Sequence, residues 1–229
     1  MAPLDTRSKV RATAVAVAAL GLVVVVGLLI VASPSWSASE VRVVAAVHDA
    51  SNGVFDIIAL AVNSGFGPVG AALIVLILVA WVAVLRRSWR DATLLLLVLV
   101  VPWSLAETIK IIVQRPRPDP SAMTTALIVP DPSSFSYPSG HTAFATALVS
   151  AVVLVLVTRR RRNVLVASVI GGAVILITAW SRVYLGVHYP TDVTASIVVV
   201  IAVAIAVHRW TADLRMFAEG ASRDGARQS

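Results

Sequence analysis

Hydrophobic and polar positions divide the chain into six long apolar runs, each free of charged residues and separated from the next by a shorter polar segment. The runs cover residues 12–32, 67–85, 92–106, 142–158, 164–181 and 193–207. Because about 20 apolar residues cross a bilayer as an α-helix, the pattern predicts an all-α polytopic membrane protein with six transmembrane helices. The third run is short unless its helix continues to Val113, which would bring Glu107 and Lys110 into or beside the membrane. Such a pair indicates function first and mutual neutralisation at spacing i, i+3 second.

The composition agrees with a membrane protein. The chain has 229 residues, of which 58% are hydrophobic and 14% charged, and its mean hydropathy is +0.88. The absence of cysteine excludes disulfides, a thiolate nucleophile and Cys-ligated zinc. The net charge of +7 could suggest nucleic acid, but the basic residues form short clusters between the apolar runs, as topology signals do. We therefore expect membrane lipids and no nucleic acid as partners, and the oligomeric state stays open.

The basic clusters also predict the orientation. With six spans, all of them fall on one side, which the positive-inside rule makes cytoplasmic: Arg7, Lys9 and Arg11; Arg86, Arg87 and Arg90; residues 159–162; and Arg209 and Arg215. The first run is longer than a signal-peptide core and no cleavage site follows it, so we expect an uncleaved helix. The predicted organisation is a cytoplasmic tail at 1–11, a membrane domain at 12–208 and a flexible cytoplasmic tail at 209–229.

Residues 33–66 lie on the opposite, outer side. Their apolar stretches are interrupted by Glu40, Asp49, Asp56 and a break at 51–53. This pattern predicts short helices along the outer membrane surface. We interpret His48 as an interfacial polar contact rather than a metal ligand, because no residue at metal-binding spacing stands near it.

Two outer segments combine helix boundaries with polar chemistry. In residues 110–118, two prolines end the third helix, so Lys110 stands on the helix and Arg117 on non-helical backbone. In residues 137–141, Pro138 suits the first turn of a helix whose N-terminal amides at Ser139 and Gly140 could bind an anion, with His141 as a proton donor. Each segment alone also fits a structural role, as an interfacial cation or an ordinary Pro-initiated helix.

The third outer segment covers residues 181–192. Pro190 predicts a helix start that places Asp192 in the first turn, close enough to accept a hydrogen bond from one nitrogen of His188 and leave the other as a nucleophile. The alternative is an Asp that complements the helix dipole. Together with the cation Arg182, the three segments supply what phosphoryl transfer requires. No Asp, Glu and His constellation suits Mg²⁺ or Zn²⁺, so we expect neither a metal nor a cofactor.

These segments resemble the signature of the type 2 phosphatidic acid phosphatase (PAP2) superfamily, written K-x6-R-P, P-S-G-H and S-R-x5-H-x3-D. Every motif position is present, from Lys110 to Arg117-Pro118, in residues 138–141, and from Ser181-Arg182 to His188 and Asp192. The resemblance covers about half the chain, from the third run to the sixth. The first ninety residues match in hydropathy alone.

The resemblance implies a role for each motif residue. His188 would attack phosphorus and become a phosphohistidine, Asp192 would orient it, and His141 would protonate the leaving oxygen and later activate water. The phosphoryl oxygens would be held by Lys110, Arg117, Arg182, Ser139 and the amide of Gly140. Three residues outside the motif, Glu107, Arg115 and Tyr184, are interpreted as local neutralisation or packing.

The expected function is metal-independent hydrolysis of a lipid phosphate or diphosphate on the outer face of the cell membrane. Undecaprenyl diphosphate is placed slightly ahead of phosphatidylglycerophosphate and phosphatidate. A rival of another class is an organophosphate transporter or binding protein without turnover, although paired histidines favour chemistry. The same signature occurs in soluble vanadium haloperoxidases, against which six spans argue.

Overall fold

The computed structural model describes residues 6–130, 135–157 and 160–211, and these residues form helices and no strand, as predicted. In chain order the elements are α1 (Thr6–Val31), α2 (Pro34–Asp49), α3 (Gly53–Phe66), α4 (Pro68–Ala80) continued by the π-helix η1 (Trp81–Leu85), α5 (Trp89–Val113), the 3₁₀ helix η2 (Pro120–Ala122), α6 (Gly140–Ala151) continued by the π-helix η3 (Val152–Leu156), α7 (Arg161–Tyr184) and α8 (Pro190–Thr211).

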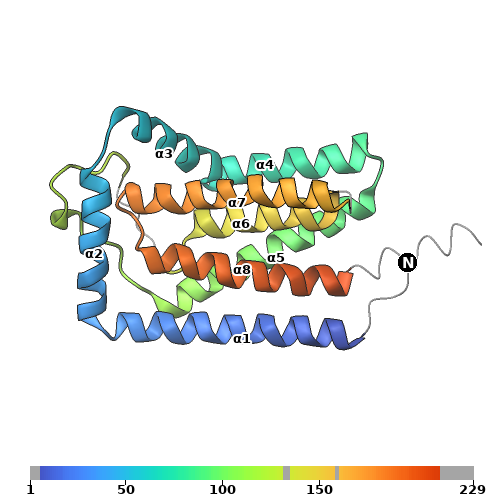
Figure 1. The fold of residues 1–229 in the computed structure, drawn as a ribbon, viewed down its shortest axis with the longest axis horizontal. Coiled ribbons are helices and arrows are strands. Elements are labelled where there is room, and N and C mark those ends of the chain that lie inside the picture. The colour runs from blue at the N-terminus through green and yellow to red at the C-terminus, as the bar shows by residue number, and fades with distance from the viewer. Residues whose placement is uncertain (1–5, 131–134, 158–159, 212–229) are drawn as a thin grey trace, which may run out of the picture.

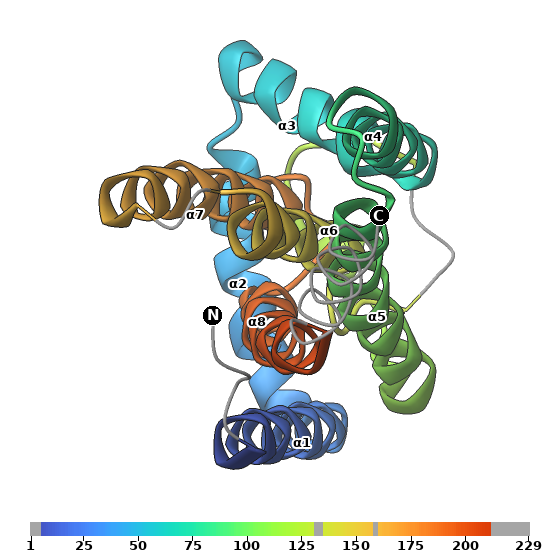
Figure 2. The same ribbon diagram turned by 90° about the vertical axis from the view of Figure 1, so that its right-hand side faces the viewer.

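The long helices run side by side in one bundle, with α6 and α8 at its centre (Figures 1 and 2). Helix α8 packs against α1, α5 and α6, and α6 also packs against α5 and α7. Exposed apolar side chains such as Val15, Leu29, Leu76, Ile77 and Leu176 cover the outer helices, as a lipid-facing surface requires. The chain is a multi-pass integral membrane protein.

Five of the six predicted spans are long and apolar enough to cross a membrane: α1, α4 with η1, α5, α7 and α8. The run at 142–158 instead forms the shorter apolar helix Gly140–Leu156. Most of the residues of α6 are buried by the surrounding helices, among them Ala143, Phe144 and Ala147. The predicted extension of the third run is confirmed, because α5 continues to Val113. The residue that caps it, Gln114, has a left-handed φ of 54°.

Residues 33–66 form two short helices, as predicted. Helix α2 lies across one end of the bundle and α3 leads back from it to α4 (Figure 1), with a bend of 117° between them. The side chain of Asn52 caps α3 by accepting hydrogen bonds from the amides of Val54 and Phe55. His48 makes the expected polar contact, since its Nδ1 lies 2.8 Å from the carbonyl oxygen of Tyr184.

Some boundaries differ from the prediction. Helix α6 begins at Gly140 rather than at Pro138, because Ser139 has the extended backbone of an N-cap (φ −73°, ψ 118°) and its amide donates to the carbonyl of Asp192 at 3.2 Å. Helix α1 already begins at Thr6, within the expected tail. Residues 1–5, Arg159, and residues 212–229 with Arg215 lie outside the described residues.

Candidate active site

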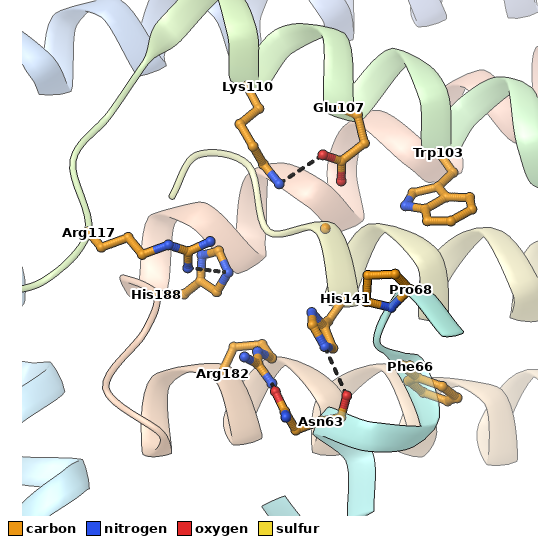
Figure 3. Close-up of a pocket in the computed structure, with 11 residues that line it drawn as sticks. Asn63, Phe66, Pro68, Trp103, Glu107, Lys110, Arg117, His141, Arg182 and His188 are labelled. Carbon is orange, nitrogen blue, oxygen red and sulfur yellow. Dashed lines mark hydrogen bonds and ion pairs between the residues drawn. The ribbon is translucent and has the colours of Figure 1, made fainter. Parts of the chain in front are cut away.

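A cavity of about 390 Å³ opens at the end of the bundle that α2 crosses. Its walls combine elements that are distant in sequence, from the end of α3 to the segment between α7 and α8 (Figure 3). The lining residues are Asn63, Phe66, Pro68, Trp103, Glu107, Lys110, Arg117, Gly140, His141, Arg182 and His188. The cavity thus brings both motif histidines and the three predicted cations to one place.

His188 is oriented by a contact at each ring nitrogen. Its Nδ1 lies 3.2 Å from Oδ2 of Asp192, as the spacing predicted. Its Nε2 lies 3.1 Å from Nη1 of Arg117, which also donates to the carbonyl of Val187 at 2.7 Å. A guanidinium can only donate, so Nε2 is the acceptor and the proton belongs on Nδ1. The lone pair of Nε2 is therefore available toward the cavity once Arg117 turns to another acceptor.

Burial lowers the pKa of His188 well below its usual range, and the positive charges of Arg117, Arg182 and Lys110 lower it further. The imidazole is thus neutral at neutral pH. A neutral imidazole is the nucleophilic form.

Asp192 is held from behind by Arg115. One guanidinium nitrogen, Nη1, donates to Oδ1 of Asp192 and to Oγ1 of Thr191, both at 2.7 Å. The other, Nη2, donates to Oε2 of Glu40 in α2 at 2.8 Å, and the guanidinium stacks 3.7 Å above the ring centre of Tyr189. Arg115 has the local neutralising role expected from its sequence, and it also fixes the aspartate that orients His188.

The remaining cations surround the cavity. Lys110 pairs with Glu107 at 2.9 Å on the same face of α5, and Nη1 of the buried Arg182 donates to Oδ1 of Asn63 at 2.9 Å. A Cβ added at Gly140 would lie 2.5 Å from Oε1 of Glu107 and 3.3 Å from Nζ of Lys110. Glycine at the start of α6 thus leaves room for the carboxylate of Glu107 in its pair with Lys110.

His141 projects from the first turn of α6, and its Nε2 lies 3.2 Å from the carbonyl oxygen of Asn63. Asn63 therefore contacts both His141 and Arg182. Within the described residues there is no group of three or more His, Cys, Asp or Glu side chains that could hold a metal ion. Guanidinium, ammonium and helix N-terminal amides are the groups that can compensate phosphate charge here.

A family model described as the PAP2 superfamily matches residues 91–216. The chain belongs to the PAP2 superfamily. Three curated relatives align with about half of it: an "Undecaprenyl-diphosphatase" of Sulfolobus acidocaldarius (31% identity over 51% of this chain and 53% of the relative), "Phosphatidylglycerophosphatase B" of Bacillus subtilis (33%, 47% and 51%) and "Undecaprenyl-diphosphatase BcrC" of Bacillus subtilis (35%, 46% and 50%). The chain thus spans about half the length of the curated relatives it matches.

A transmembrane PAP2 structure shares the fold over most of the chain. It is the "first transmembrane PAP2 type phosphatidylglycerolphosphate phosphatase from Bacillus subtilis", with a TM-score of 0.68, 22% identity and coverage of 88% of this chain and 96% of that one. At this identity the likeness bears on the fold alone. The structural likeness also covers residues outside the three sequence motifs.

Three buried residues of the PAP2 motifs do not line the cavity: Ser139, Ser181 and Asp192. Asp192 is buried behind His188. The hydroxyl of Ser139 is also buried and accepts a hydrogen bond from Thr142 at 3.2 Å, so its expected place on a phosphoryl oxygen stays a prediction. Ser181 donates within α7 to the carbonyl of Thr178. Tyr184 packs away from the cavity, where its hydroxyl donates to Asp56 at 2.6 Å.

The motifs do not include Asn63, Glu40 or the apolar residues Phe66 and Pro68 on the cavity wall. All four lie in the first ninety residues. Asn63 stands in the apolar run just before Gly67-Pro68, and an isolated amide there is the one signal that could have pointed to it.

Proposed function

We propose that the protein is a membrane lipid phosphatase that works without a metal through a phosphohistidine intermediate. The observation that supports this most directly is the pair of histidines in one cavity, His188 with Asp192 at Nδ1 and its Nε2 among three cations, and His141 at the start of α6. A binding protein needs the cations alone. A dedicated carboxylate behind one histidine is what nucleophilic catalysis uses.

In the first step, the Nε2 lone pair of His188 attacks phosphorus and the bond from phosphorus to the lipid oxygen breaks. Protonated His141 gives its proton to that oxygen, and the lipid alcohol leaves. Arg117 turns from Nε2 to a phosphoryl oxygen, where Lys110 and Arg182 also compensate charge. Asp192 stabilises the positive charge that develops on His188.

In the second step, a water molecule gives a proton to His141 while its oxygen attacks the phosphohistidine. The bond between phosphorus and nitrogen breaks, inorganic phosphate is released, and His188 regains its lone pair. His141 is again protonated, so the cycle consumes one water and leaves the protein unchanged.

The cavity lies at one end of the bundle, which suits a lipid whose head is presented at the membrane surface while its tail stays in the bilayer. The described basic clusters 7–11, 86–90 and 160–162, and Arg209, lie at the opposite end (Figure 1). This separation supports a cavity on the extracytoplasmic face. Undecaprenyl diphosphate is the first candidate substrate, because it is released from carrier duty on that face and two relatives bear its name.

Phosphatidylglycerophosphate is the second candidate, and a specific feature of the cavity favours it. Glu107 places a carboxylate among the lining residues. In a diphosphate, the phosphate next to the scissile bond would meet this negative charge. In phosphatidylglycerophosphate a neutral hydroxyl lies next to the scissile ester, and the phosphodiester is at the far end of the glycerol.

The test is release of inorganic phosphate from lipid phosphates by the purified protein. We expect release that persists in EDTA and is inhibited by vanadate, which mimics the five-coordinate transition state. Binding of lipid phosphates without release would favour the transporter or binding protein. Loss of activity in EDTA with recovery in Mg²⁺ would contradict the metal-independent mechanism.

A further inference from the structure

The cavity has two chemically different halves. Arg117, Arg182 and Lys110 surround His188 in one half, and Phe66, Pro68 and Trp103 form the other (Figure 3). In this view His141 and Glu107 lie between the two. Under the proposed mechanism the phosphoryl group occupies the cationic half. The leaving group then extends past His141 toward the aromatic half, because the acid must reach the leaving oxygen.

Glu107 places a negative charge at the border of the leaving-group half. It is the one carboxylate among the described residues that line the cavity. Oε2 accepts from Lys110 at 2.9 Å, while Oε1 lies against Gly140 at the start of α6. The Glu107 side chain is 41% exposed, against 12% for Lys110, so the carboxylate keeps room to meet a ligand group.

Trp103 stands one helical turn before Glu107 on the same face of α5. Its ring packs edge to face against Phe144, with centroids 5.2 Å apart. The indole Nε1 is buried and has no hydrogen-bond partner among the residues described. Buried donors are normally satisfied. An acceptor on a bound molecule would satisfy this one after a small adjustment of the ring.

We infer that Glu107 and Trp103 form a leaving-group subsite for an alcohol that bears a hydroxyl, and no phosphate, next to the scissile ester. This inference rests on the proposed function and deepens it by naming the substrate class, and it reverses the order of the two candidate substrates given above. A glycerol hydroxyl beside the scissile ester donates to Glu107, and its oxygen accepts from Nε1 of Trp103. A leaving group whose phosphate is joined directly to the scissile phosphoryl group brings that charge against the carboxylate instead, so the subsite favours a phosphomonoester of glycerol over a diphosphate.

A simpler role for Glu107 is to neutralise Lys110. The two roles predict different outcomes. Neutralisation of Lys110 alone affects every substrate through the shared phosphoryl group, so removing the Glu107 charge changes all rates by a similar factor. A leaving-group subsite changes the ratio between substrates.

The experiment compares kcat/KM of the purified full-length protein for phosphatidylglycerophosphate, phosphatidate and undecaprenyl diphosphate. Next to the scissile bond, the first leaving group bears a free hydroxyl, with its phosphodiester at the far end of the glycerol. The second bears no free hydroxyl there, and the third bears a phosphate. In Glu107→Gln we expect kcat/KM for the diphosphate relative to phosphatidylglycerophosphate to rise about tenfold. Glu107→Asp keeps the charge and should keep the ratio. Asp91→Asn, which removes the same charge near the inner end of α5, is the matched control.

Trp103→Phe is the second variant, because it removes the N–H and keeps an aromatic ring. It should lower the preference for phosphatidylglycerophosphate over phosphatidate several-fold. Unchanged ratios in both variants would overturn the subsite, as would a fall in the diphosphate ratio in Glu107→Gln. Absence of phosphate release from all three lipids by the wild-type protein would instead refute the proposed function, and the subsite with it.

Discussion

His188 illustrates how neighbouring groups can prepare one side chain for the nucleophilic role that we propose for it. Asp192 accepts from Nδ1 and thereby fixes the tautomer, and Arg117 identifies Nε2 as the acceptor. The described lining of the cavity offers one other imidazole, His141, which the proposed mechanism uses as the acid. Substitution of each histidine should therefore impair a different step of the reaction.

His188→Ala should abolish both turnover and covalent labelling, because it removes the atom that bonds to phosphorus. His141→Ala should still form the phosphoenzyme from an aryl phosphate, whose leaving group needs no acid, and should form it slowly or not at all from a lipid alkoxide. Asp192→Asn should fall between the two. Acid-labile, base-stable phosphate after rapid quench measures all three. Labelling of His188→Ala, or equal impairment of His141→Ala on both substrates, would show that the roles are assigned wrongly.

The pH dependence of labelling should also report on His188. Its pKa is lowered by burial first and by the Arg117 charge second, so the neutral form persists as the pH falls through 6.5. Protonation of His188 should therefore stop its labelling by an aryl phosphate only at much lower pH. Arg117→Gln removes a positive charge, which raises the pKa of His188, so the acid limb should move to higher pH. The ionisation of the substrate affects the wild type and the variant equally, so the difference between their acid limbs reports on the protein. An acid limb that stays in place or moves to lower pH in Arg117→Gln would contradict this electrostatic account.

Among the elements, α2 is tied to the active site through a buried charge network. Glu40 of α2 accepts from Arg115 and from both the amide and the hydroxyl of Thr191, at the start of α8. Arg115 in turn holds Asp192. A helix outside the family match thus helps to position Asp192, the aspartate to which the proposed mechanism gives a catalytic role.

Arg115→Met should destabilise the fold by about 3–5 kcal/mol, because it leaves the buried carboxylate of Asp192 and the largely buried one of Glu40 without their guanidinium partner. Thermal unfolding in detergent should show a large fall in Tm. The double variant Arg115→Met with Glu40→Gln should recover part of the loss, since one of the two unpaired charges is gone. A Tm near that of the wild type in the single variant would mean that water or rearrangement satisfies both carboxylates.

The sequence predicted the helices and the motif residues better than the residues that hold the motif side chains in place. Helix spans follow from apolar length, and the contact between His188 and Asp192 follows from a spacing within one helix start. Asn63, Glu40 and Arg115 act across contacts between segments far apart in the chain, which no local pattern specifies. The start of α6 was misplaced for a related reason, because the amide of Ser139 bonds to the carbonyl of Asp192 in another helix.

For the whole molecule, the bundle separates two kinds of chemistry. The cavity with both histidines is at one end and the described arginine clusters are at the other (Figure 1). From the positive-inside rule we expect the cavity end to be extracytoplasmic and both termini to be cytoplasmic. An orientation of this kind can be tested directly, because the chain has no cysteine of its own.

Two single-cysteine variants make the test. Ser121→Cys lies in η2 at the cavity end, and Asn163→Cys lies at the start of α7 at the opposite end; both positions are exposed. A membrane-impermeant maleimide applied to intact cells should label the first and not the second, while permeabilised cells should label both. The reverse pattern would place the active site in the cytoplasm. A substrate exposed only on the outer leaflet, such as a spent carrier diphosphate, would then be out of reach, and the proposed substrates would have to be sought among lipids of the inner leaflet.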